Sequence, residues 1–290
     1  HKSNWILSDL PNSLRNAILV FVLAKAVRVH RGQHKKHCTM MVNISRFNNV
    51  QSQAYELIEN YLDLVREDIN SNSKKSIYPT SSVLNELQSI YDQEFIEKAN
   101  NTNIQQYPEW SELDFFKAVR FMKVALVNMT AGQLDYEKEK KDGLTVIAIG
   151  GLALSRGLTL EGLTVSYIIR NASAYDTLMQ MGRWFGYRDG YEDLCRLYIQ
   201  KTSQTHYKQT TKAIAELREE LARMQDLGKT PREFGLKVLS HPQSLAITAL
   251  NKMRTATKVT HFEGLGGESE EVFAVYADND KNRGNRNLPR

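Results

Sequence analysis

Residues 144–170 read LTVIAIGGLALSRGLTLEGLTVSYIIR, and this stretch is the strongest indication of the fold in the sequence. Two short apolar runs rich in β-branched residues, 144–150 and 163–170, are typical of strands buried in a parallel sheet. The loop between them should lie at the sheet edge where ligands bind. We expect this loop to bind phosphate, because it combines glycines, hydroxyls and a cation. These residues are Gly150, Gly151, Ser155, Arg156, Gly157 and Thr159.

The following segment, residues 171–191, adds more arginines. A turn at 171–173 and a helix over 175–187 would place Gln180, Arg183 and Arg188 near the same sheet edge as Arg156. Guanidinium groups gathered in one cleft are costly to bury without an anion. Phosphoryl transfer needs such groups to neutralise charge on the γ-phosphate. For the loop alone, the alternative is a plain connection in which Arg156 makes a structural ion pair.

These residues resemble the last two motifs of superfamily-two helicase-type ATPases. Arg156-Gly157 resembles motif V, and the run from Gln180 to Arg183 resembles the arginine-finger motif VI. In that pattern a second arginine follows three residues after the first, whereas here position 186 is Gly and the next arginine is Arg188. Gln180 also lies one residue closer to the glycine than in that pattern.

Residues 150–167 and 180–191 are similar to the Z1 (Z-one) domain family, which carries an endonuclease label. Members of this family are attached to helicase-type ATPase modules in bacterial restriction and phage-defence loci. The resemblance covers about residues 39–250. It implies an α/β fold with a RecA-like, mainly parallel sheet flanked by helices on both faces over residues 1–200. A helical C-terminal extension would follow over 201–275, and a mobile tail over 276–290.

The resemblance also implies the C-terminal lobe of an ATP-dependent nucleic-acid motor. An N-terminal ATPase lobe would bind most of the ATP and Mg²⁺, and the other partners would be DNA or RNA and restriction or methyltransferase components. The arginine finger would be Arg183, together with Arg188. Residues implied at the nucleotide are Gly157, Thr159, Gln180 and Gly182. Residues implied at the nucleic acid are Ser45, Arg46, Ser155 and Arg156.

Ser45 and Arg46 follow a predicted strand at 39–45 and resemble motif IV, although this stretch could instead cap a helix that begins at Asn48 or Asn49. Apolar spacing predicts that helix over 50–69, a second from about residue 82, and a charged helix around 214–224 that Gly228 ends. Ser111 is expected to cap a further helix. Further strands are expected at 124–129 and 194–199.

The composition narrows the class of protein. The chain has 290 residues, 41% of them hydrophobic, which suffices for one α/β domain and a smaller appendage. A net charge of +5 permits a polyanionic partner.

The cysteines and the apolar runs bear on where the protein is located. Two cysteines, Cys38 and Cys195, indicate a reducing cytoplasm, and the apolar run 17–27 is too short to span a bilayer. The first residue is His1 rather than Met, which predicts a fragment of a longer protein.

Two other functions stay open on the sequence. A Mg²⁺-dependent endonuclease could use Asp135 and Glu139, although their charged run is better explained as a solvated loop. A non-catalytic nucleic-acid-binding scaffold is the other. Residues 30–38 contain three histidines and Cys38, but their spacing matches no closed zinc site, so a basic loop is expected.

The sequence contains no phosphate-binding loop of the form GxxxxGK[ST]. Residues 227–230 read LGKT, yet position 223 is Arg where the first glycine should stand. We therefore expect this chain not to hydrolyse ATP by itself.

Overall fold

The computed structural model describes residues 5–73, 79–100, 107–127, 134–151, 154, 159–169, 189–229, 237–240, 256–261 and 270–275. These residues form two compact units that divide between Ile199 and Gln200.

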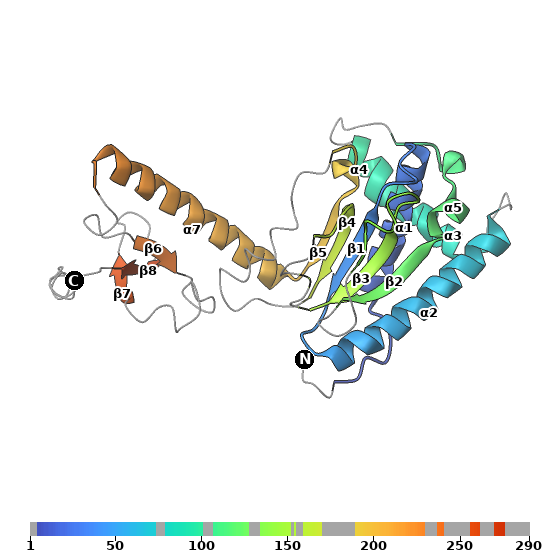
Figure 1. Ribbon diagram of the computed structural model, residues 1–290, viewed down its shortest axis with the longest axis horizontal. Helices are drawn as coiled ribbons and strands as arrows, with labels where there is room; N and C mark the ends of the chain where they lie inside the picture. The colour runs from blue at the N-terminus through green and yellow to red at the C-terminus, as the bar shows by residue number, and fades with distance from the viewer. Residues whose placement is uncertain are drawn as a thin grey trace. The chain divides into compact units, whose positions relative to one another are not determined.

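A five-stranded, all-parallel sheet forms the centre of the first unit (Figure 1). In the order β2-β3-β1-β4-β5, its strands are β2 (Met122–Val127), β3 (Thr145–Gly150), β1 (Cys38–Asn43), β4 (Leu163–Ile168) and β5 (Arg196–Ile199). All residues of β1, β3 and β4 are buried, as their continuous apolar runs predict for a parallel sheet. The α/β fold class is thereby confirmed, and it is consistent with a RecA-like domain.

Helices pack against this sheet. They are α1 (Asn12–His30), α2 (Asn48–Asn72), α3 (Val83–Tyr91) and α5 (Phe115–Val119), together with a π-helical turn η1 (Asp92–Ile96), α4 (Glu97–Asn100) and a 3-10 turn η2 (Trp110–Glu112). Buried side chains of α1, α2, α3 and α5 join alternate strand residues such as Met40 and Ile147 in one core. The predicted helix over 175–187, which would add cover to the sheet, lies outside the described residues.

Local sequence accounts for the helix positions. The predicted stripe of α2 is buried, from Val50 through Ile58 to Ile69, and Ser82 caps α3 by accepting a hydrogen bond from the Leu84 amide. The predicted cap at Ser111 is wrong. Ser111 lies within η2, which Glu109 and Glu112 close as a reciprocal capping box. The helix α5 therefore starts later, where the Asp114 carboxylate accepts from the Lys117 amide.

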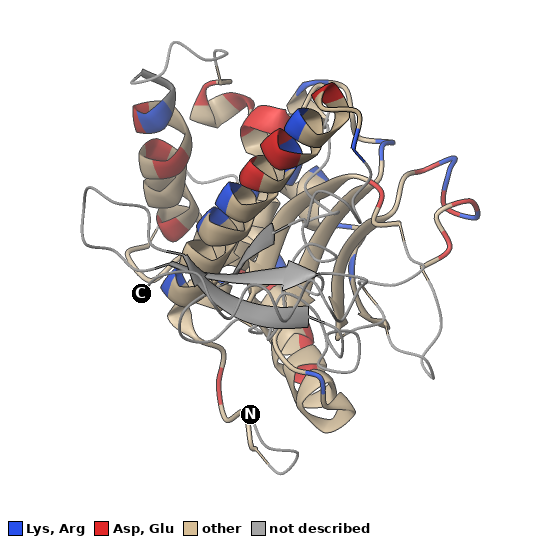
Figure 2. Cartoon of the chain, turned by 90° about the vertical axis from the view of Figure 1, so that its left-hand side faces the viewer, with Lys and Arg blue, Asp and Glu red and all other residues tan. Residues whose placement is uncertain are grey.

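Charged residues are nearly absent from the sheet of the first unit. Its five strands contain Lys123 and Arg196 and no other charged side chain. Figure 2 shows that Lys, Arg, Asp and Glu lie mainly on the helices and loops. No helix within the described ranges is both long and apolar enough to cross a bilayer.

The second unit begins with the long helix α7 (Lys201–Asp226). Gly228 ends it as predicted: its φ is +61°, and the amides of Gly228 and Lys229 donate to the carbonyls of Gln225 and Met224. An antiparallel sheet in the order β6-β8-β7 follows, with β6 (Lys237–Ser240), β7 (Ala256–His261) and β8 (Glu270–Val275). The sequence predicts only helices in this extension, and these three described strands correct that prediction.

Candidate functional site

The strand order directs attention to the carboxyl edge of the parallel sheet. The chain leaves β1 toward β2 and β3 on one side, whereas it leaves β4 toward β5 on the other side. In open α/β sheets, ligands bind where the connections diverge in this way. The carboxyl ends of β1 and β4 lie side by side there, because the Ile169 amide donates to the Asn43 carbonyl at 3.1 Å.

Gly151 brings two distant sequence motifs together at this edge. It follows β3 and opens the glycine-rich loop, and a Cβ at this position would lie 2.9 Å from Gln51 Nε2 and 3.2 Å from the Ser45 carbonyl oxygen. Gln51, in the first turn of α2, donates from Nε2 to that same carbonyl at 3.0 Å. A side chain at this position would therefore force the Gln51 amide or the Ser45 carbonyl to shift. The start of the loop is therefore packed against the predicted Ser45–Arg46 motif.

Ser45 and Arg46 differ in what they offer to a ligand. Ser45 is buried, and its hydroxyl accepts a hydrogen bond from the Phe47 amide at 3.2 Å. This bond holds the turn that leads into α2. Arg46 is exposed, its guanidinium lies 4.8 Å from the centre of the Phe47 ring, and no acidic partner for it occurs in the described parts of the chain. Arg46 is thus the cation at this edge that can meet an anion.

The N-terminus of α2 adds to the positive potential beside Arg46. The helix has 25 residues and begins at Asn48, its N-cap Phe47 makes no side-chain cap, and its first turn contains no acidic residue. The first amides of a helix have no partner within the helix, and the aligned peptide dipoles favour negative charge there. Together with Arg46, this terminus suits a phosphate group.

Two buried amide oxygens at this edge have no hydrogen-bond partner within the described structure. They are Asn43 Oδ1 and Gln51 Oε1, on side chains that are 1% and 2% exposed as whole residues. An unsatisfied buried group of this kind costs about 1–3 kcal/mol. Neither residue was predicted as a site residue. The available sequence signals were a polar residue at the end of an apolar strand, for Asn43, and a polar residue beside an apolar helical stripe, for Gln51.

Most of the other predicted site residues lie outside the described residues. They are Ser155, Arg156, Gly157, Gln180, Gly182, Arg183 and Arg188. Thr159 is described and exposed, but its neighbours lie at the amino edge of the sheet, opposite Ser45. There the Glu161 carbonyl accepts from Thr39 Oγ1 at 2.7 Å, at the start of β1. The loop begins at one edge and ends at the other because β3 and β4 are parallel.

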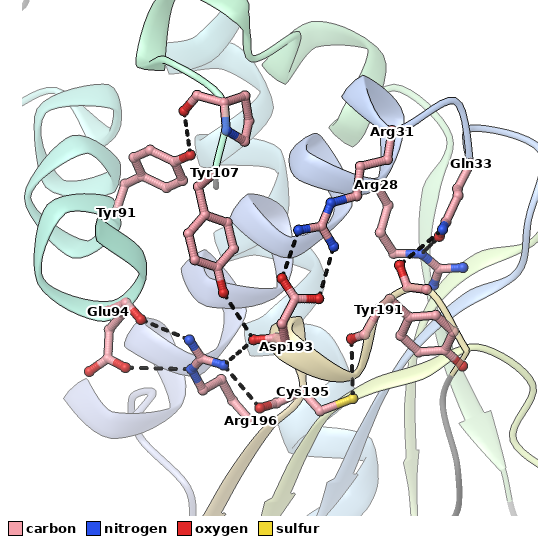
Figure 3. A network of polar contacts seen from close by, with 12 residues as sticks. Arg28, Arg31, Gln33, Tyr91, Glu94, Tyr107, Tyr191, Asp193, Cys195 and Arg196 are labelled. Carbon is pink, nitrogen blue, oxygen red and sulfur yellow. Dashed lines mark hydrogen bonds and ion pairs between the residues drawn. The ribbon is translucent and has the colours of Figure 1, made fainter. Parts of the chain in front are cut away.

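The amino edge holds a polar network around Asp193, which precedes β5 (Figure 3). Arg31, just after α1, donates to both Asp193 carboxylate oxygens at 2.9 and 2.7 Å. Arg196 donates to the Asp193 carbonyl at 2.9 Å and to the Glu94 carbonyl at 2.7 Å. Burial raises the pKa of Asp193, but the hydrogen bonds and charge of Arg31 outweigh it and leave the pKa lowered. This network fixes the approach to β5.

The same end of α1 also holds the chain two residues after Arg188. Gln33 Nε2 donates to the Gly190 carbonyl at 3.1 Å, and Arg28 Nε donates to Gln33 Oε1 at 2.9 Å. The Arg28 guanidinium lies 4.1 Å from the centre of the Tyr191 ring (Figure 3). The segment that follows Arg188 is thus anchored at the amino edge.

The alternative metal and nuclease residues have protein partners. His37 Nδ1 accepts from the Leu144 amide at 2.9 Å. Asp135 pairs with Lys138 at 3.0 Å, and Glu139 pairs with Lys123 at 2.9 Å. Among the residues that the structure describes, no group of three or more His, Cys, Asp or Glu side chains could hold a metal ion.

Comparison with known proteins identifies the family. The model of the Z1 domain family matches residues 13–245, a range that includes the parallel sheet, the carboxyl-edge residues and the arginine segment. Comparisons with curated proteins and with solved structures gave no match. Since the family model covers most of the sequence, the chain belongs to the Z1 domain family.

Proposed function

We propose that this chain is the C-terminal lobe of an ATP-dependent nucleic-acid motor that acts in restriction or phage defence. The observation that carries the proposal is the junction at the carboxyl edge. There Arg46, which has no acidic partner among the described residues, lies beside the start of the glycine-rich loop and the N-terminus of α2, whose N-cap residue makes no side-chain cap. This is the edge where α/β sheets bind ligands.

In this proposal Arg46 contacts a phosphate of DNA or RNA. Ser45 and Gln51 position the turn that presents Arg46, through the bonds to the Phe47 amide and the Ser45 carbonyl. The loop that starts at Gly151 continues to Ser155 and Arg156, which contact the same strand. The beginning of the loop packs against the Ser45–Arg46 turn. A change at the nucleotide would therefore be transmitted to the nucleic acid through this junction.

Arg183 acts in this proposal as an arginine finger, while Gln180, Gly182 and Gly157 line the nucleotide. ATP and Mg²⁺ are bound mainly by an N-terminal lobe, because this chain contains no GxxxxGK[ST] sequence. A finger stabilises the charge that develops on the γ-phosphate in the transition state. This lobe would supply the positive charge of the finger, and it would not hydrolyse ATP alone.

A non-catalytic nucleic-acid-binding module is the second candidate. The observation that favours it is that the same edge could bind phosphate without any turnover, since Arg46 and the α2 N-terminus need no ATP. A protein of this kind would bind nucleic acid but would show no nucleic-acid-stimulated ATP hydrolysis.

The test is ATP hydrolysis by the full-length protein with and without single-stranded nucleic acid. Arg183→Ala should lower kcat by about a thousandfold or more while ATP binding is retained, since fingers contribute that much to the rate. Arg223→Ala, an exposed arginine of α7, is the matched control and should keep wild-type kcat. A kcat of Arg183→Ala equal to that of the wild type would exclude Arg183 as the arginine finger. A wild-type protein that hydrolyses no ATP would favour the binding module.

A further inference from the structure

The corner between α5 and β2 carries two exposed aromatic rings around one arginine. Phe116 is 49% exposed and Phe121 is 68% exposed. The Arg120 guanidinium is close to both rings, 5.8 Å from the centre of the Phe116 ring and 4.9 Å from the centre of the Phe121 ring. Single exposed apolar residues are common on protein surfaces. Two rings that share one guanidinium form a more specific arrangement.

Buried neighbours hold this corner in place. Phe115, Ala118 and Val119 of α5 are buried, as is Met122 at the start of β2. The Asp114 carboxylate caps α5 by accepting from the Lys117 amide at 2.8 Å. The exposed rings therefore stand on a fixed base, and they lose little conformational freedom when a flat partner stacks on them.

The charge of the corner is positive. Residues 115–123 read FFKAVRFMK, with three cations and no acidic residue. Lys117 and Arg120 are exposed, and neither has an acidic partner in the described ranges of the chain. Lys123 pairs with Glu139 at 2.9 Å on the surface, where such a pair is weak and exchangeable. The surface is suited to a polyanion that also has flat apolar groups.

We propose that the α5–β2 corner, defined by Phe116, Lys117, Arg120 and Phe121, is a binding platform for single-stranded nucleic acid. Phe116 and Phe121 stack on bases, and Lys117 and Arg120 contact the phosphates between them. Every base has a π face, so the platform binds without sequence preference. It adjoins the start of β2 at the amino edge, whereas Arg46 follows the carboxyl end of β1, so the two contacts are separate.

A protein partner is the competing occupant of the corner. The core of a protein–protein interface is depleted in lysine, and its aromatic anchors sit in desolvated pockets. Here the two rings flank two cations, Lys117 and Arg120, in one short stretch. The charge pattern therefore favours nucleic acid, and the experiment separates the two occupants.

The experiment measures binding of fluorescent oligo(dT) and oligo(U) to the chain by anisotropy. The double variant Phe116→Ala with Phe121→Ala should weaken binding at least tenfold, because each stacked base contributes strongly to affinity. Phe121→Trp should bind like the wild type, whereas Phe121→Leu should bind more weakly, since Leu keeps the apolar area but has no π face. Arg120→Ala should reduce the slope of log affinity against log salt by about 0.7, one phosphate contact on a single strand.

Leu64→Ala is the matched control, because Leu64 is 60% exposed on α2 and lies outside the corner. It should bind both oligonucleotides like the wild type. Photocrosslinking with 5-iodouridine, followed by peptide mapping, should label Phe116 or Phe121. A difference between the two oligonucleotides would identify DNA or RNA as the preferred strand.

The platform is overturned if the double alanine variant binds both oligonucleotides as tightly as Leu64→Ala does. It is also overturned if Phe121→Leu and Phe121→Trp bind the oligonucleotides equally, because the aromatic face of residue 121 would then contribute nothing to binding. None of these readouts needs ATP. Loss of binding in the double variant would therefore support the platform even if the full-length protein showed no ATP hydrolysis.

Discussion

At the scale of single residues, the fit of Gly151 is the sharpest constraint on the candidate site. Its φ is not in the left-handed region, so the need for glycine here comes from space alone. A methyl group would meet the Gln51 amide and the Ser45 carbonyl, and the carbonyl belongs to backbone that cannot easily move. The residue therefore determines how closely the glycine-rich loop approaches the turn that carries Arg46.

Gly151→Ala should destabilise the protein by about 1–3 kcal/mol, the usual cost of overpacking. The measurement is urea unfolding followed by circular dichroism. In a Gln51→Ala background the same substitution should cost less, because the nearest contact, at 2.9 Å, is removed. Equal costs in both backgrounds would show that Gln51 does not contact Gly151 as described.

Asp193→Asn should destabilise the first unit by about 3 kcal/mol at pH 7, because it leaves Arg31 half-buried without its carboxylate. The pKa of Asp193 is lowered below its ordinary value of 3.8, so the carboxylate stabilises the fold above about pH 4 and loses this effect as the pH falls further. Urea unfolding at pH 7 and pH 3 should show a smaller difference between wild type and variant at pH 3. An unchanged difference would contradict the ion pair.

At the scale of elements, α1 contains a buried cation without an acidic partner among the described residues. Lys25 is 3% exposed, and its Nζ donates to the His34 carbonyl at 3.2 Å. Burial lowers the pKa of Lys25 from its ordinary 10.5, because the charged form loses its hydration. The charged form of Lys25 is therefore less favourable in the folded protein than in the unfolded chain.

Lys25→Met should stabilise the protein by about 1 kcal/mol at pH 7, since Met fills similar space without a charge. Below pH 10.5 the unfolded chain holds the Lys25 proton more tightly than the folded chain does. Wild-type stability relative to the variant should therefore rise as the pH increases toward 10.5. Urea unfolding between pH 7 and pH 10 tests this. A stability difference between Lys25→Met and the wild type that stays constant or widens as the pH rises would contradict the lowered pKa of Lys25.

The helices and strands differ in how well the sequence predicts them. The strands β1, β3 and β4 and the helix α2 were predicted because continuous apolar runs and a 3.6-residue stripe are local signals. The strands β6, β7 and β8 were missed because each has only four to six residues of mixed polarity and depends on pairing with distant segments. Asn43 and Gln51 were missed for a related reason. Nothing near them in sequence shows that Gly151 packs against this turn.

At the scale of the whole molecule, two positive features bear on nucleic-acid binding. Arg46 and the α2 N-terminus occupy the carboxyl edge, and the α5–β2 corner adjoins the amino edge. The chain has a net charge of +5, so general attraction of a polyanion is also expected. The effect of removing Arg46 itself must therefore be separated from the effect of removing one positive charge from the chain. The matched variant Arg223→Ala removes the same charge from α7.

The most direct test of the account is the nucleic-acid concentration that half-stimulates ATP hydrolysis by the full-length protein. Arg46→Ala should raise this concentration about tenfold, the equivalent of about 1.4 kcal/mol, and reduce its dependence on salt by about one phosphate contact. Arg223→Ala should leave it near the wild-type value. Equal values for the two variants, or stimulation that is insensitive to Arg46→Ala, would contradict the assignment of the carboxyl edge as the nucleic-acid contact of the motor.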